Sequence, residues 1–219
     1  MRTVAVAALL ALVALLVASS AGARDPKEPQ KRTSAADVAL AKSIVLVRSD
    51  FAGGWKAAPK PKPQPPCSIE PDESKLVKTA GLDPTFVWKD GFTQVGSEVD
   101  VFANAKQARL DWKLSTLRLM SVCLLESARD ALGKKAKVAI SSAEALPAPK
   151  LGERSLHFRI VLTGSKNRPP IVTELIGVGI GRISVVLHAF SLATALPPSG
   201  LDALTATLAK RLAKASGAI

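Results

Sequence analysis

Three runs of residues near the C-terminus decide the fold: 153–164 (ERSLHFRIVLTG), 170–179 (PIVTELIGVG) and 182–192 (RISVVLHAFSL). In the first run, Leu156, Phe158, Ile160 and Leu162 occupy every second position, as in a β-strand whose one face packs against helices. The links between the runs suit hairpins and are too short for crossover helices, so neighbouring strands should be antiparallel. Together with 136–146, these runs predict a four-stranded antiparallel unit.

The rest of the chain predicts one more pair of strands and four helices. Asp90-Gly91 lies between two β-prone runs, 84–90 and 92–102, and this dipeptide is a strong hairpin signal. Apolar spacing and capping residues predict helices at 34–47, 72–79, 105–132 and 200–215. We therefore expect an α+β fold: a curved antiparallel sheet of about six strands with helices packed mainly on one face, similar to an α/β/α sandwich.

The first residues are laid out as a secretory signal peptide, 1–23. Arg2 precedes an apolar run at 4–18, and small residues follow at Ala21 and Ala23. The run is shorter than the stretch of about twenty residues that crosses a membrane as a helix. We therefore expect cleavage after Ala23 and a secreted, extracytoplasmic protein of the cell envelope with no transmembrane segment in its mature form.

The rest of the chain divides into a flexible tether at 24–33 and a single α+β domain at 34–216. Within this domain, 57–66 forms a proline-rich loop. Its prolines occur mostly at alternate positions, which favours an extended polyproline conformation. The loop is interpreted as a semi-rigid spacer, and a ligand for a proline-recognition module is the alternative.

Cys67 and Cys123 are the two cysteines of the chain. In an oxidising compartment an even number of cysteines predicts a disulfide, here one that closes a long loop and stabilises the fold by about 4 kcal/mol in the chain-entropy model. A redox pair or a thiol nucleophile is the alternative interpretation, but the cysteines do not form a Cys-x-x-Cys motif.

The charge of the chain favours anionic surroundings. Its formal net charge is +12, which suits an anionic lipid, a glycolipid or a wall polymer as a partner, although a solvated basic surface explains the same charge. Nucleic acid is not expected, since the sequence contains no zinc-finger spacing, basic zipper or aromatic RNA-binding motif. We expect a monomer.

A ligand site is expected on the sheet face that points away from the helices. His157, Arg159, Glu174, Arg182 and His188 are the candidate ligand-binding residues, on the assumption that their strands bring them into one polar concavity. The hydroxyl side chains that could line the same concavity are Thr163, Thr173 and Ser184. Two histidines and one carboxylate would be a bare minimum for a metal, so neither a metal nor another cofactor is expected.

Catalytic motifs are weak. No serine lies in a Gly-x-Ser-x-Gly elbow, and 177–181 (GVGIG) lacks the spacing and the following helix of a dinucleotide site. Glu98 and Asp100 alternate on one strand and so face the same side, which suits acid–base chemistry only if the rest of a site exists. No enzyme activity is expected.

Several features of the chain occur together in one family. A helix leads into Asp50-Phe51-Ala52-Gly53-Gly54-Trp55, Cys67 precedes a short helix, and Val99-Asp100-Val101-Phe102, Cys123-Leu124 and Gly181-Arg182 follow in that order. This pattern resembles the secreted actinobacterial sensor-type domains, the group of PknH-like extracellular domains and LpqN-type lipoproteins with PsbP-like architecture.

The resemblance implies an extracytoplasmic binding or sensing module without catalysis. The chain departs from the group in having one potential disulfide instead of two, and in having neither a kinase domain nor a lipid-attachment cysteine. Three functions follow as hypotheses: a secreted non-enzymatic ligand- or partner-binding module of the envelope, a secreted hydrolase acting on cell-wall or lipid substrate, and a structural protein that docks to anionic polymers through its basic surface.

Overall fold

A computed structural model describes residues 26–59, 66–132, 137–164, 169–193, 196 and 198–217. The predicted signal peptide and most of the proline-rich loop lie outside these residues. The helices are α2 (Ala35–Ile44), the 3-10 turn η1 (Arg48–Asp50), α3 (Ala105–Leu114), α4 (Leu117–Leu132) and α5 (Pro198–Ala215). The strands are β1 (Gln30–Lys31), β2 (Trp55–Ala57), β3 (Val77–Leu82), β4 (Thr85–Trp88), β5 (Gln94–Phe102), β6 (Ala139–Ala145), β7 (Arg154–Thr163), β8 (Ile171–Ile180) and β9 (Ile183–Leu192).

All nine described strands belong to one sheet. Its order is β1-β3-β5-β9-β8-β7-β6, with β4 beside one end of β5 and β2 beside β4. Each strand pair is antiparallel except β1 with β3. The predicted α+β class and the large, mostly antiparallel sheet are confirmed, and the short strands β1, β2 and β3 account for the strands beyond those expected.

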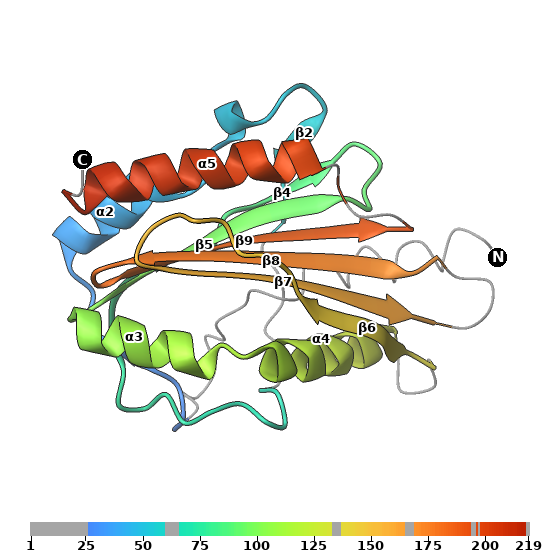
Figure 1. Ribbon diagram of the computed structural model, residues 1–219, viewed down its shortest axis with the longest axis horizontal. Coiled ribbons are helices and arrows are strands. Elements are labelled where there is room, and N and C mark those ends of the chain that lie inside the picture. The colour runs from blue at the N-terminus through green and yellow to red at the C-terminus, as the bar shows by residue number, and fades with distance from the viewer. Residues whose placement is uncertain are drawn as a thin grey trace.

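Helices cover both faces of this sheet (Figure 1). On one face, α2 and α5 pack on a core that includes Val99, Val185 and Leu187. On the other face, α4 packs its Leu124 against Ile160 in a second core. The four helices are thus divided between the faces in an α/β/α arrangement, where the sequence predicted helices mainly on one face.

The β4–β5 hairpin forms as its Asp-Gly dipeptide predicts. Gly91 has a φ of +76°, a left-handed conformation that glycine adopts without steric cost. The Asp90 carboxylate accepts hydrogen bonds from the backbone N–H groups of Phe92 and Thr93, at 2.8 and 3.0 Å. The turn sets the register of β5, whose side chains then point alternately toward α2 and α5 or toward α3 and α4.

Two predicted helices differ in the structure. The pattern at 105–132 is divided into α3 and α4 by Ser115 and Thr116, and the Thr116 hydroxyl accepts a hydrogen bond from Leu119 N at 3.2 Å at the start of α4. The helix expected at 72–79 does not form. Its second half belongs to β3 instead, because pairing with β5 satisfies its backbone groups and outweighs a weak helical preference.

Part of the stretch expected to be a tether is also ordered. Within 24–33, Gln30 and Lys31 form β1, and Gln30 N donates to Leu76 O at 2.8 Å. The physical reason is that β3 offers an unpaired edge, to which an adjacent extended segment can add by backbone hydrogen bonds. Helix α2 then starts as predicted, with the Ser34 hydroxyl accepting from Asp37 N.

Candidate functional site

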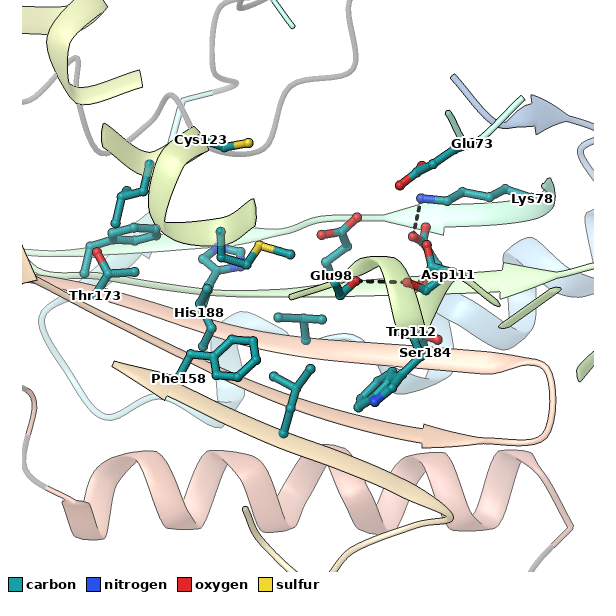
Figure 2. A pocket seen from close by; sticks show the side chains of 18 residues that line it. Glu73, Lys78, Glu98, Asp111, Trp112, Cys123, Phe158, Thr173, Ser184 and His188 are labelled. Atoms are coloured by element: carbon teal, nitrogen blue, oxygen red, sulfur yellow. Dashed lines mark hydrogen bonds and ion pairs between the residues drawn. The ribbon is translucent and has the colours of Figure 1, made fainter. Parts of the chain in front are cut away.

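A cavity of about 330 Å³ lies between the sheet and the layer of α3 and α4 (Figure 2). This volume is at the lower end of the range for small-ligand sites. Its walls come from β3, β5, β7, β8, β9, α3, α4 and the segment before β3. The lining residues are Glu73, Lys78, Glu98, Asp100, Asp111, Trp112, Ser115, Met120, Cys123, Leu124, Leu156, Phe158, Thr173, Leu175, Ser184, Val186, His188 and Phe190.

Charged side chains gather at one end of the cavity. Figure 2 shows Glu73, Lys78 and Asp111 on that side, while Phe158 and Thr173 lie toward the opposite end. Lys78 on β3 forms an ion pair with Asp100 on β5, with 2.5 Å between Nζ and Oδ2. The two strands are antiparallel neighbours, so the register of β3 with β5 brings the ammonium to the carboxylates.

The carboxyl groups at this end have shifted pKa values. Burial, reinforced by repulsion from Asp100, raises the pKa of Glu98 to about 8 although Lys78 opposes the shift. Burial likewise raises the pKa of Asp111 to about 7, and burial raises the pKa of Glu73. Burial alone would lower the pKa of Lys78, but attraction to Asp100, Glu98 and Asp111 raises it. The single ammonium therefore does not balance the carboxyl groups around it.

His188 lies on β9 within the cavity wall and is buried. Its imidazole lies over Gly96 of β5, where a Cβ would meet His188 Nε2 at 2.2 Å, so only glycine leaves room for the ring. Nε2 also lies 3.4 Å from the Thr85 hydroxyl. Burial lowers the pKa of His188 to about 4, so the ring is neutral at neutral pH and contributes no positive charge.

Apolar side chains form most of the remaining wall. They are Trp112, Met120, Leu124, Leu156, Phe158, Leu175, Val186 and Phe190. Trp112 on α3 lies close to β8 because residue 177 is glycine, at which a Cβ would meet the indole at 2.8 Å. The guanidinium of Arg154 lies 5.7 Å from the Trp112 ring, which fixes this side of the wall. The cavity is thus acidic at one end and apolar over the rest of its length.

Two buried hydroxyl groups of the cavity have no hydrogen-bond partner among the residues that the structure describes. They are Thr173 Oγ1 on β8 and Ser184 Oγ on β9, and these residues are only 1% and 5% exposed. Ser184 lies directly opposite Asp100 across the β5–β9 pair, at the acidic end. A buried polar group without a partner costs free energy, and a ligand or water in the cavity would remove that cost.

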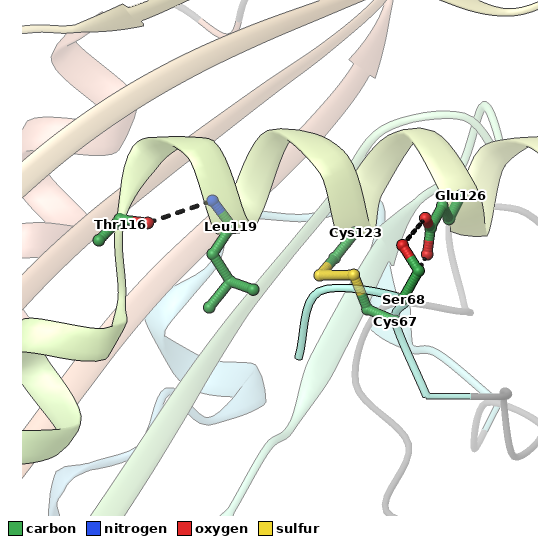
Figure 3. The surroundings of a disulfide bond; sticks show 6 residues. All are labelled: Cys67, Ser68, Thr116, Leu119, Cys123 and Glu126. Atoms are coloured by element: carbon green, nitrogen blue, oxygen red, sulfur yellow. Dashed lines mark hydrogen bonds between the residues drawn. A yellow bond between two sulfur atoms is a disulfide. The ribbon is translucent and has the colours of Figure 1, made fainter. Parts of the chain in front are cut away.

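The disulfide anchors one wall of the cavity (Figure 3). Cys67 is bonded to Cys123 of α4, with 5.2 Å between the Cα atoms, so the predicted pairing is confirmed. The next residue, Ser68, donates its backbone N–H to Glu126 of α4 at 2.8 Å, and its hydroxyl also donates to that carboxylate. Since Cys123 lines the cavity, the crosslink ties the segment that leads to Glu73 and β3 to the apolar wall.

The ligand-binding residues expected from the sequence are not brought into one concavity. His157, Arg159 and Glu174 lie on the face of α2 and α5, where Glu174 Oε1 is 2.6 Å from Arg159 Nη2 and Oε2 is 3.4 Å from His157 Nε2. Arg182 pairs with Asp37 of α2 at 2.5 Å. Of these five residues only His188 lines the cavity, on the opposite face, together with the expected hydroxyl residues Thr173 and Ser184.

The register of β8 with β9 explains this separation. The strands are joined at Gly181 and Arg182, and in the resulting pairing His188 lies opposite Leu175 and not beside Glu174. Residues opposite each other share a face, so Glu174 and His188 point in opposite directions. The expected face away from the helices does not exist either, because both faces carry helices.

Sequence reasoning did identify part of the cavity wall: Glu98 and Asp100 from their alternation on a strand, and Thr173, Ser184 and His188 among the residues expected to line a polar concavity. It did not identify Glu73, Lys78, Asp111 or Trp112. Lys78 lay in a predicted helix, and the two α3 residues gave no signal apart from a charged and an aromatic position near the end of that helix. Their contribution depends on how α3 is seated on the sheet, which the sequence pattern does not specify.

Within the described ranges, no cluster of three or more His, Cys, Asp or Glu side chains is placed to hold a metal ion. None of the helices in the described part of the chain has the length and apolar character needed to cross a membrane.

No family model and no curated protein matches this chain. Its fold is similar to that of the extracellular domain of PknH from Mycobacterium tuberculosis, at a TM-score of 0.37 and 11% identity over 63% of this chain and 66% of that domain, which is just under two thirds of it. It is also similar to an uncharacterized protein from Mycobacterium smegmatis, the Rv0999 ortholog, at a TM-score of 0.40 and 11% identity over 77% of this chain and 96% of that chain. The likeness concerns the fold alone, and no function, ligand or partner follows from values this low.

Proposed function

We propose that this protein is a non-enzymatic binding module that works outside the cytoplasm and takes a small amphipathic molecule into the cavity between its sheet and the α3–α4 layer. The observation that carries the proposal is the pair of buried hydroxyl groups, on Thr173 and Ser184, that line the cavity and have no hydrogen-bond partner among the described residues. Buried polar groups are normally satisfied, so such a pair indicates that something else satisfies them.

Location outside the cytoplasm is supported by two independent features. The first residues have the layout of a signal peptide, and the Cys67–Cys123 bond belongs in an oxidising compartment. The net charge of +12 would hold the protein near anionic lipid, glycolipid or wall polymer, without any need for those polymers to enter the cavity.

A neutral fluorescent probe tests the binding function. N-phenyl-1-naphthylamine is uncharged at neutral pH and fluoresces strongly only in apolar surroundings, so the folded protein should bind it with a stoichiometry of one and a clear gain in emission. Val186→Phe should weaken this binding by about tenfold or more, because the added ring fills space that the probe needs.

The control carries the same substitution elsewhere. Val47 is 41% exposed and lies outside the cavity, so Val47→Phe should bind the probe as the wild type does. No gain in emission with the wild type, or equal binding by Val186→Phe, would show that the cavity is not a binding site.

Acid–base catalysis is a second candidate, favoured by one observation. The raised pKa values of Glu98 and Asp111, about 8 and about 7, lie in the range in which a carboxylic acid can donate a proton at neutral pH. The corresponding activity would be hydrolysis of a cell-wall or lipid substrate. If this candidate is right, 4-nitrophenyl esters or glycosides should be turned over by the wild type and by Glu144→Gln, an exposed site on β6, but not by Glu98→Gln.

A further inference from the structure

The acidic end of the cavity has more negative than positive groups. Among the residues that line the cavity, the carboxyl groups of Glu73, Glu98, Asp100 and Asp111 face the single ammonium of Lys78. Lys78 already forms an ion pair with Asp100, with 2.5 Å between Nζ and Oδ2. Glu98 and Asp111 are therefore left with no cation of their own in the wall.

The surrounding charged groups do not supply that cation. The guanidinium of Arg154 attracts Asp111, but it also donates to the backbone carbonyls of Gly181 and Ile183, at 3.1 and 3.4 Å, and to Glu153 at 3.3 Å. His188, the remaining basic side chain of the wall, is neutral at neutral pH. The groups that act on Glu98 are otherwise Asp100, Lys78, Asp111 and Asp83.

A buried hydroxyl group without a partner points to a ligand at this same end. Ser184 Oγ lies across the strand pair from Asp100, and the described residues offer it no hydrogen bond. A hydroxyl oxygen can accept a hydrogen bond from an ammonium group, as carboxylates can. Beyond Ser184, the wall continues with Leu156, Phe158 and Leu175, which suit a hydrocarbon body.

We propose that the cavity takes an amphiphile with a primary ammonium head, which is held by Glu98, Asp111 and Ser184 while the hydrocarbon body lies against Phe158 and Leu175. This inference rests on the proposed binding function and adds the charge of the ligand to it. The proposed ligand is a cation, whereas the net positive charge of the chain suggests an anionic ligand. Carboxylates at contact distance act on a bound head group more strongly than the diffuse surface charge, which salt screens. An organic cation is favoured over a metal ion because no metal-binding cluster occurs among the described residues.

The test compares three eight-carbon probes that differ only in the head group. Octylamine, octan-1-ol and octanoate are titrated into the folded protein at pH 8 by isothermal titration calorimetry. The ammonium should bind at least about tenfold more tightly than the alcohol, and the carboxylate should bind most weakly, since charges at contact distance in a partly buried site interact more strongly than they do in water.

Binding of octylamine should also depend on pH in a defined direction. Affinity should rise from pH 6 to pH 8.5, because Glu98 and Asp111 ionise over this range while an alkylamine, with a pKa of about 10.4 as in lysine, stays charged. Protons should be released on binding at pH 7, which is measured by repeating the titration in buffers of different ionisation enthalpy. The affinity for octan-1-ol should change little with pH.

Matched variants separate local charge from overall charge. Glu98→Gln combined with Asp111→Asn should remove the preference for octylamine, whereas Asp130→Asn combined with Glu144→Gln, at exposed positions outside the cavity, should leave it intact. Equal affinity for amine and alcohol in the wild type, or a preference kept by the cavity variant, would overturn the ammonium assignment and leave the binding function standing. If no probe binds to protein whose fold is verified by circular dichroism, both proposals are wrong.

Discussion

Lys78→Met should lower the free energy of unfolding at pH 8 by about 3–5 kcal/mol, the usual cost of removing one partner of a buried ion pair. Among the described residues of the cavity wall, its ammonium is the single cation beside the carboxyl groups of Glu73, Glu98, Asp100 and Asp111. Without Lys78, the carboxylate of Asp100 would remain buried and unpaired beside its neighbours. Urea denaturation followed by circular dichroism measures this loss.

The loss should shrink as the pH falls toward 5. A carboxyl group whose pKa is raised in the folded protein stabilises it below the unfolded pKa of about 4, and this contribution is lost as the pH rises through the folded pKa. With Lys78 present, the folded pKa values are about 7 for Asp111 and about 8 for Glu98, and loss of the ammonium raises both further, so the destabilisation from these two groups appears mainly above pH 7 and is absent near pH 5, where both are protonated in either protein. Burial lowers the pKa of His188, so this residue lowers the stability of both proteins at acid pH. The effect is the same in both and does not contribute to the difference between their free energies of unfolding.

Two comparisons identify the cause of the effect. Lys113→Met, at an exposed position of α3, should change stability by less than about 0.5 kcal/mol. Adding Asp100→Asn to Lys78→Met should restore part of the stability, since the stranded charge is then gone. If Lys78→Met is as stable as Lys113→Met at pH 8, Lys78 does not offset a repulsion among the carboxylates of the cavity.

Removing the disulfide with Cys67→Ser and Cys123→Ser should cost about 4 kcal/mol, the chain-entropy value for a crosslink between residues 56 positions apart. It should also weaken binding of N-phenyl-1-naphthylamine, because Cys123 lines the cavity and the bond holds the Cys67 segment against α4. Urea denaturation and the fluorescence titration measure the two effects.

The wild type in reductant provides the control for this variant. Both proteins lack the crosslink, so they should unfold at nearly the same urea concentration, and any difference between them measures what the exchange of thiol for hydroxyl contributes. If the wild type in reductant keeps the stability of the oxidised protein, while labelling shows two free thiols, the crosslink does not stabilise the fold as expected.

The C-terminal sheet could be predicted from the sequence because two constraints coincide there. Apolar residues at every second position of 153–164 specify a strand, and short links specify antiparallel neighbours, so β7, β8 and β9 fall within a few residues of the expected bounds. In the segment at 72–82, no apolar alternation and no short link to a neighbouring strand coincide in this way. Its strand exists because β5 offers a pairing edge, which is a tertiary effect that local preference does not show.

The candidate site was predictable only in part. Alternation placed Glu98 and Asp100 on one side of β5, and both line the cavity. His157 and His188 were expected to meet, but the face of each strand depends on the register across its turns, where one residue reverses every side chain. Asp111 and Trp112 could not be found from β-periodicity at all, because they come from a helix laid over the sheet.

The break between α3 and α4 separates two sets of residues in the cavity wall. Helix α3 supplies Asp111 and Trp112, whereas α4 supplies Met120, Leu124 and the crosslinked Cys123. Under the proposed binding function, mutations on α3 would change which ligand charge is preferred without altering the half of the wall that the disulfide anchors. Homologues adapted to different molecules should vary at the positions of Asp111 and Trp112 more than at the position of Cys123.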